Sequence, residues 1–256
     1  MNMLNITAAE IETFIFVFLR VGAIVVTIPI FGSTSAPARV KAGLSLMIAL
    51  LIFPFVEMAP PPPEILPLIV RMLGEVMIGI IIGFAGSLIF AGVQMAGQLV
   101  GFQMGFAIVN VFDPVTSSQV SILAQFQYLF AVLLFLALDG HHVYLSAVAD
   151  SYRLVVPFEF SFSGELVRSI AGLAKDLFII AVKVGAPAVA VLLMVDIGFG
   201  LIARTVPQMN ILIVGFPVKI AMGLVGIGLA LPLVSRMMGS IFIGFGDRLH
   251  ELLRLM

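Results

Sequence analysis

Hydrophobic residues in this chain are gathered in six long runs, near residues 13–30, 42–56, 66–100, 121–138, 170–203 and 210–235. An apolar helix needs about 20 residues to cross a bilayer, so several of these runs reach spanning length. The second run is short for one crossing, whereas the third and fifth are too long for one. The pattern predicts an all-α integral membrane protein with about six apolar helices. No tandem repeat or domain boundary interrupts it, so we expect a single domain over residues 1–256.

Two residue types inside the runs predict how these helices bend and pack. Prolines interrupt most of them, at Pro29, Pro54, Pro187, Pro217 and Pro232. Each proline removes an amide donor, so we expect kinked helices. Glycines recur four residues apart, at Gly79 and Gly83 and again at Gly97 and Gly101. Small residues at this spacing let two helix backbones approach closely, so these four glycines are predicted helix-packing positions.

The stretch "GFQMGFAIVNVFDPVTSSQV", residues 101–120, is too apolar for a surface loop and too polar at its end for a membrane span. Within the segment 105–121, Gly105 frees the backbone and Asp113-Pro114 is predicted to end the helix, because proline disfavours helical geometry at the residue before it. Bulky apolar side chains lie between them, at Phe106, Ile108, Val111 and Phe112. Irregular backbone at membrane depth is tolerated only where protein covers it or where it lines a water-filled cavity. The residues alone leave two interpretations open, an apolar gate in a pathway and a packed re-entrant loop.

The last residues, 241–256, have the pattern of an amphipathic helix. Apolar side chains fall on one stripe, at Phe242, Phe245, Leu249, Leu252 and Met256. Such a helix either lies on a membrane surface or docks on a partner, and the residues leave both options open.

Composition narrows the class of protein. Of the 256 residues, 61% are hydrophobic and 11% are charged, whereas ordinary globular chains are about a quarter charged. The net charge of -1 gives no sign of a nucleic-acid surface. There is no cysteine, and His141 and His142 beside Asp139 do not have the spacing of metal ligands. We therefore expect no metal and no cofactor, and we interpret these histidines as helix-end residues.

Charged residues inside the apolar runs suggest an alternative function. A lone ion facing lipid costs at least several kcal/mol, so Arg20, Glu75, Lys183 and Asp196 must face protein or water. They either cross-link helices or form the path of a secondary transporter, although the two halves of the chain show no inverted repeat. Arg71 lies four residues before Glu75 and can pair with it. An intramembrane enzyme would need a serine or acid pair, which we do not find beside the histidines.

Three stretches together resemble the FliR family of flagellar biosynthesis proteins, called SctT in virulence secretion systems. They are "PIFGSTSAPARVKAGLSLMIALLIFP" at 29–54, "AGQLVGFQMGFAIVNVFDP" at 96–114 followed by "LDGHH" at 138–142, and "RTVPQMNILIVGFPVKI" at 204–220. The third stretch is the most specific, and its pattern is Arg204, Pro207, Gln208, Asn210, Gly215, Phe216 and Pro217. Asp139 departs from the asparagine of flagellar members, which leaves a virulence export gate as the alternative to the flagellar one.

The resemblance implies a subunit of the type III protein export gate, without enzymatic activity. Such proteins join FliP-like and FliQ-like subunits as bent helical hairpins in a helical hetero-oligomer, next to FlhB-like and FlhA-like proteins. The assembly sits in the bacterial inner membrane within the flagellar basal body, and unfolded rod, hook and filament subunits pass through it. Residues matching 106–121 plug its channel, with Gly105 as a hinge. The resemblance therefore implies a plug formed by Phe106, Ile108, Val111, Phe112, Asp113 and Pro114.

Overall fold

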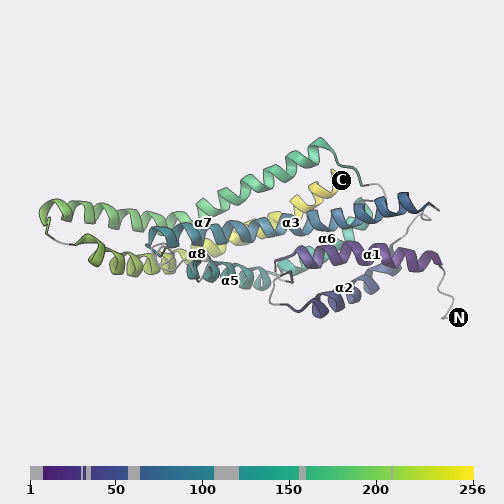
Figure 1. The fold of residues 1–256 in the computed structure, drawn as a ribbon, viewed down its shortest axis with the longest axis horizontal. Helices are drawn as coiled ribbons and strands as arrows, with labels where there is room; N and C mark the ends of the chain where they lie inside the picture. The colour runs from purple at the N-terminus through teal and green to yellow at the C-terminus, as the bar shows by residue number, and fades with distance from the viewer. Residues whose placement is uncertain are drawn as a thin grey trace. The chain divides into compact units, whose positions relative to one another are not determined.

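A computed structural model describes residues 8–29, 31–32, 36–56, 64–106, 121–155, 160–208 and 210–256. These residues form helices and contain no strand (Figure 1). The helices are α1 (Ala8–Thr27), α2 (Ala38–Ile52), the 3₁₀ turn η1 (Phe53–Phe55), α3 (Ile65–Gln103), α5 (Ile122–Ala137), α6 (Gly140–Leu154), α7 (Gly164–Thr205) and α8 (Ile211–Arg254). The all-α class predicted from the apolar runs is confirmed.

Several helices are long and apolar enough to cross a membrane. Among the described residues these are Ala38–Phe55, Ile65–Gln103, Gly164–Thr205 and Ile213–Arg254, and α5 together with α6 would give a fifth. The long runs at 66–100 and 170–203 each form one helix, of 39 and 42 residues. Proline does not end α7 or α8. Pro187 lies inside α7, and Pro217 and Pro232 lie inside α8. The chain is a membrane protein, and its described residues hold four helices of spanning length, or five spans if α5 and α6 form one, where the runs predict about six.

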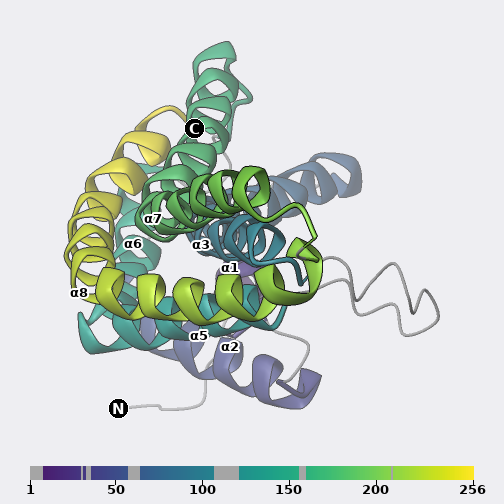
Figure 2. The same ribbon diagram turned by 90° about the vertical axis from the view of Figure 1, so that its left-hand side faces the viewer.

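The chain divides into two compact units. Unit 1 comprises residues 1–88, 139–173 and 243–256, and unit 2 comprises residues 89–138 and 174–242. The helices α3, α7 and α8 contribute residues to both units. In unit 1, α1 and α2 lie side by side (Figure 1). In unit 2, the second part of α7 and the first part of α8 form a hairpin (Figure 2), where Gly226 faces Val191 and Ala188.

A buried ion pair joins three helices of unit 1. Arg20 of α1 is fully buried, and its Nε donates to Oε2 of Glu75 in α3 over 2.6 Å. Its Nη1 donates to the carbonyl oxygen of Ser151 in α6 over 2.8 Å. The guanidinium also lies 4.2 Å from the ring centroid of Tyr152, whose hydroxyl donates to the Val17 carbonyl over 3.2 Å. The acceptors of Arg20 come from α3 and from the end of α6, so the ion pair fixes α1 against both helices.

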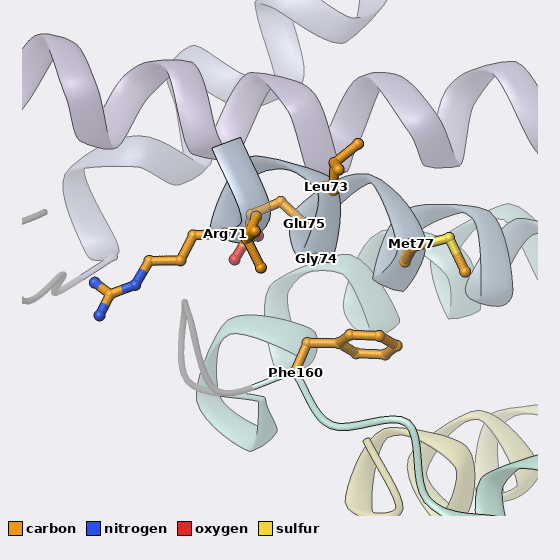
Figure 3. A pocket seen from close by; sticks show the side chains of 7 residues that line it. Arg71, Leu73, Gly74, Glu75, Met77 and Phe160 are labelled. Atoms are coloured by element: carbon orange, nitrogen blue, oxygen red, sulfur yellow. The ribbon is translucent and has the colours of Figure 1, made fainter. Parts of the chain in front are cut away.

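A cavity of about 240 Å³ lies beside Glu75 (Figure 3). Its walls are mainly apolar and include Leu73, Met77 and Phe160. Among the described residues, no group hydrogen-bonds Oε1 of Glu75, the carboxylate oxygen that Arg20 does not take.

Glycines of α3 allow α1 to approach closely in unit 1. A Cβ atom at Gly79 would lie 2.5 Å from the Arg20 carbonyl oxygen, and one at Gly83 would overlap the Thr27 side chain. Any larger residue at either position would push α1 away from α3. The same contact brings Arg20 within reach of Glu75, because Gly79 lies one helical turn after Glu75 in α3.

The C-terminal residues differ from their prediction. Residues 241–254 are the end of α8, and the whole apolar stripe is buried inside the chain. Phe245 packs against Tyr144 of α6 with ring centroids 5.3 Å apart, and the Met256 carbonyl accepts a 2.8 Å hydrogen bond from the Ser161 amide. The expectation of a stripe left free for a membrane surface or a partner is therefore wrong, because the chain itself covers it.

We expect Glu75→Leu to lower the stability of the protein by about 3–5 kcal/mol, because it leaves Arg20 buried without a counter-ion. Thermal unfolding in mild detergent measures the effect. Arg20→Met combined with Glu75→Leu should recover most of the loss, since an apolar pair replaces a buried ion pair at little cost. Arg168→Met, at an exposed position of α7, is the control and should change little. A double variant no more stable than Glu75→Leu would contradict this account.

Candidate functional site

The end of α3 in unit 2 is closed by a glycine cap. Gly105 has φ +91°, a left-handed conformation that glycine adopts readily. The amide of Phe106 donates to the Gly101 carbonyl over 3.1 Å, and the amide of Gly105 donates to the Phe102 carbonyl over 3.0 Å. This pair of hydrogen bonds is the Schellman motif. The helix therefore ends at Gln103, whereas Asp113 and Pro114, which were predicted to end it, lie outside the described residues.

One face of α8 packs on this helix end. A Cβ atom at Gly105 would lie 2.5 Å from the Phe216 ring, and one at Gly223 would lie 2.7 Å from Sδ of Met104. Phe106 and Ile220 pack against a buried cluster that includes Met104. The α8 residues Phe216, Ile220 and Gly223 follow helical spacing, so they form a single stripe.

A polar contact joins α3, α7 and α8 beside the same helix end. Asp196 of α7 forms an ion pair with Lys219 of α8, and its Oδ2 accepts a 2.9 Å hydrogen bond from Nε2 of Gln103. The side chains of Lys219 and Asp196 are 22% and 34% exposed, so water screens the pair only in part. Lys219 lies on the same face of α8 as Phe216 and Ile220. Gln103, two residues before Gly105, is thus held by a directional contact as well as by packing.

The start of α5 lies against α3 just before the cap. A Cβ atom at Gly101 would lie 2.5 Å from Oγ of Ser121, and one at Gly97 would lie 2.5 Å from Cα of Ala124. The chain therefore leaves α3 at Phe106 and rejoins α5 at Ser121 close to the point where it left. The residues on either side of 107–120, Phe106 and Ser121, therefore belong to one packed site, and we call them its anchors.

The predicted site residues fall into three places. Gly105 and Phe106 lie at the capped helix end, and Ile108, Val111, Phe112, Asp113 and Pro114 lie outside the described residues. The stretch 204–217 divides in two. Its first residues, Arg204, Pro207, Gln208 and Asn210, are exposed around the turn between α7 and α8. Its last residues, Gly215, Phe216 and Pro217, lie in α8, and Phe216 faces Gly105.

Sequence reasoning missed several residues of this site, namely Gln103, Met104, Ile220 and Gly223. For Ile220 and Gly223 the signal was present as helical spacing from Phe216, with glycine at the position nearest the bulky Met104. The four charged residues of the transporter alternative are not gathered here. Arg20 and Glu75 belong to unit 1, whereas Asp196 pairs with Lys219 and Lys183 is exposed in unit 2.

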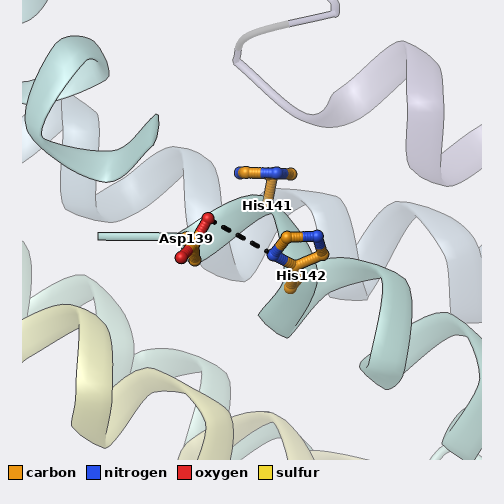
Figure 4. Close-up of side chains that lie close together, drawn as sticks. All are labelled: Asp139, His141 and His142. Carbon is orange, nitrogen blue, oxygen red and sulfur yellow. Dashed lines mark ion pairs between the residues drawn. The ribbon is translucent and has the colours of Figure 1, made fainter. Parts of the chain in front are cut away.

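A second group of side chains lies at the first turn of α6 in unit 1. Asp139, His141 and His142 each place one possible ligand atom within 4.8 Å of the others (Figure 4). Nδ1 of His142 lies 3.4 Å from Oδ1 of Asp139. Among the residues that the structure describes, this is the group whose donors could hold a metal ion.

Comparison with known proteins identifies the relatives of the chain. The sequence model of the family described as "Bacterial export proteins, family 1" matches residues 11–244. The chain is 34% identical to the flagellar biosynthetic protein FliR of Bacillus subtilis (strain 168) over 246 residues, 94% of this chain and 95% of that protein. It is 30% identical to the FliR of Pectobacterium carotovorum subsp. carotovorum, covering 95% of this chain and 93% of that protein. For the FliR of Escherichia coli (strain K12), the identity is 29%, with 98% and 99% covered.

Gly105→Ala should cost about 1–2 kcal/mol for its left-handed backbone alone, and more for the overlap with Phe216. Adding Phe216→Ala to Gly105→Ala should return the overlap part of the loss and leave the backbone part. Thermal unfolding of the two single variants and the double variant separates these contributions. Gly198→Ala, where nothing lies within 4 Å of the added Cβ, is the matched control and should be neutral or slightly stabilising. Equal effects of Gly105→Ala and Gly198→Ala would rule out the cap.

Asp196→Leu should cost about 1 kcal/mol, because it leaves Lys219 and Gln103 without their shared partner at a site that water partly screens. The exchange of Asp196→Lys with Lys219→Asp should recover stability, since the ion pair is restored and the Gln103 amide can turn to accept a hydrogen bond. Lys183→Met, at an exposed position of the same helix, is the control. An exchanged protein as weak as Asp196→Leu would argue against the polar contact.

Proposed function

Because the chain belongs to the bacterial export proteins, family 1, a component of the flagellar type III export gate, we propose that its segment 105–121 plugs the channel of that gate. The chain is a membrane component of flagellar protein export, and its family associates with other flagellar export components. What the proposal adds is the part of the chain that closes the channel.

The observation that carries the proposal is the anchoring of the segment at both of its ends. Gly105 is capped and covered by Phe216, and Ser121 lies against Gly101 of α3. Segments whose ends are held close together on a rigid scaffold are a common place for function. A plug needs this arrangement, because its anchors must stay fixed while a passing chain displaces the residues between them.

The side chains of the segment suit a seal. Phe106, Ile108, Val111 and Phe112 are bulky and apolar, and Asp113-Pro114 follows them. A narrow opening lined by such side chains excludes water and ions by dewetting. It also forms no strong bonds with an unfolded polypeptide, so the polypeptide can displace it. In the proposal Gly105 is the hinge of the plug.

We also propose that the chain acts with FliP-like and FliQ-like subunits, next to FlhB-like and FlhA-like proteins, in the inner membrane of the bacterium. The exposed turn that carries Arg204, Pro207 and Gln208 supports this proposal. These residues make no core of their own chain, and arginine is unsuited to lipid. The substrates would be unfolded flagellar subunits, and the chain would contribute a channel wall and a plug rather than a chemical step.

Deletion of residues 108–112 should leave the assembly intact and make the membrane leak ions, because the apolar seal is removed while both anchors remain. Ion conductance across reconstituted membranes measures the leak. A native mass of the particle extracted in mild detergent measures assembly, with this chain expected in one copy beside several copies of two other small hydrophobic proteins. Replacing residues 108–112 by five leucines keeps the apolar bulk and should keep the membrane tight. Conductance at the wild-type level in an assembled deletion variant would reject the plug.

A further inference from the structure

The turn that starts α6 holds three potential metal ligands that have little structural role. Asp139 stands at the N-cap of α6, where aspartate usually accepts a hydrogen bond from the first amides of the helix. Its side chain makes no such bond. Its backbone is left-handed, with φ 54°, and it is the one non-glycine residue with positive φ in the part of the chain described. Its carboxylate turns instead toward His142, 3.4 Å away.

The two imidazoles beside it are also without a clear structural role. Their ring centroids lie 4.1 Å apart at the first turn of α6 (Figure 4). Among the described residues, none hydrogen-bonds the buried Nδ1 of His141. A buried ring nitrogen without a partner costs free energy, whereas coordination of the ring to an ion would give the imidazole a function. His142 and Asp139 are 66% and 75% exposed, so an ion reaches them from solvent.

We infer that Asp139, His141 and His142 form a binding site for a transition-metal dication, with Zn²⁺ as the ion that the donors fit best. Two imidazoles and a carboxylate are ligands that Zn²⁺ accepts, and three protein ligands leave a fourth position for water. Ligand atoms about 2.1 Å from a tetrahedral ion lie about 3.4 Å apart, which is the separation of the Asp139 and His142 atoms. The hard cations Mg²⁺ and Ca²⁺ prefer oxygen ligands and do not match this set.

Bound metal would tie the Asp139 carboxylate to both imidazoles across the first turn of α6. It would thereby hold Asp139 in its left-handed conformation and fix the start of the helix. The site shares no residue with the end of α3, so it does not depend on the proposed plug. Its failure and the failure of the plug would be seen in different experiments.

The test is metal binding by the full chain, purified in mild detergent with a tag that contains no histidine and stripped with a chelator. Co²⁺ is added first, because its visible absorption reports nitrogen and oxygen ligands, and Zn²⁺ is then titrated to displace it. We expect one Co²⁺ per chain and its displacement by one equivalent of Zn²⁺. We also expect Zn²⁺ to raise the thermal unfolding midpoint, since an ion that binds only the folded state stabilises it by mass action.

Three variants and one control identify the ligands. Asp139→Asn, His141→Ala and His142→Ala should each weaken binding at least tenfold, because even the loss of an outer-shell group costs about 10- to 100-fold. Asparagine tolerates the left-handed conformation, so Asp139→Asn keeps the fold. His250→Gln is the matched control, since His250 is the third histidine of the chain and lies at another place, 3.1 Å from Asp150.

The outcomes are distinct. Stoichiometric binding that the three variants lose and His250→Gln retains would establish the site. No binding by the wild-type chain at micromolar metal would overturn the inference. Binding that His250→Gln loses, or that Asp139→Asn and His142→Ala both retain, would also overturn it. Should His141→Ala fail to fold, the two exposed positions still decide the result.

Discussion

The guanidinium of Arg20 is buried completely in a protein with several helices that are apolar enough to cross a membrane. Burial of a charge costs several kcal/mol unless the site supplies a counter-ion and hydrogen bonds. The counter-ion comes from Glu75 of α3, and further acceptors come from α6, more than a hundred residues later in the chain. The cost is offset only when α1, α3 and α6 meet in one register. Because any other register leaves a bare ion, the pair selects the arrangement of unit 1 more than it adds net stability.

At the end of α3 in unit 2, a directional polar contact again fixes how packed helices are aligned. Apolar packing between helices is not directional, so it does not by itself decide where a helix end lies. The Phe216 ring lies against Gly105, and Asp196 draws Lys219 and Gln103 to a single point. Glycine at position 105 lets the Phe216 ring come close to the backbone, and the polar contact fixes how α3, α7 and α8 are aligned. Together they make a firm anchor beside a segment that, in the proposed function, must yield.

How much of this was predictable from the sequence depends on the kind of signal. The apolar runs predict helices and a membrane class, because spanning length is a local property. The helix end was predicted at Asp113-Pro114, with Gly105 only freeing the backbone, whereas the structure has the cap at Gly105. The amphipathic stripe of 241–256 showed that one face is covered but not by what, and its cover proved to be the chain itself. The pairing of Arg20 with Glu75 could not be predicted, because hydrophobic periodicity shows which face of a helix is buried but not which helix packs against it. From the sequence, His141 and His142 beside Asp139 are interpreted as helix-end residues without the spacing of metal ligands, because how closely their side chains approach depends on one left-handed backbone angle.

The lengths of the helices bear on how the chain is solvated. Within unit 2, large apolar side chains stay exposed along α7 from Phe178 to Ile202. At 1.5 Å per residue, these two residues lie about 36 Å apart along the helix. The hydrocarbon core is about 30 Å thick, and ordinary tilts up to about 40° lengthen the path through it to about 40 Å. This apolar surface therefore matches one tilted crossing, and lipid or an equally apolar protein surface can cover it. In the proposed function, other subunits of the gate would take the place of lipid along this helix.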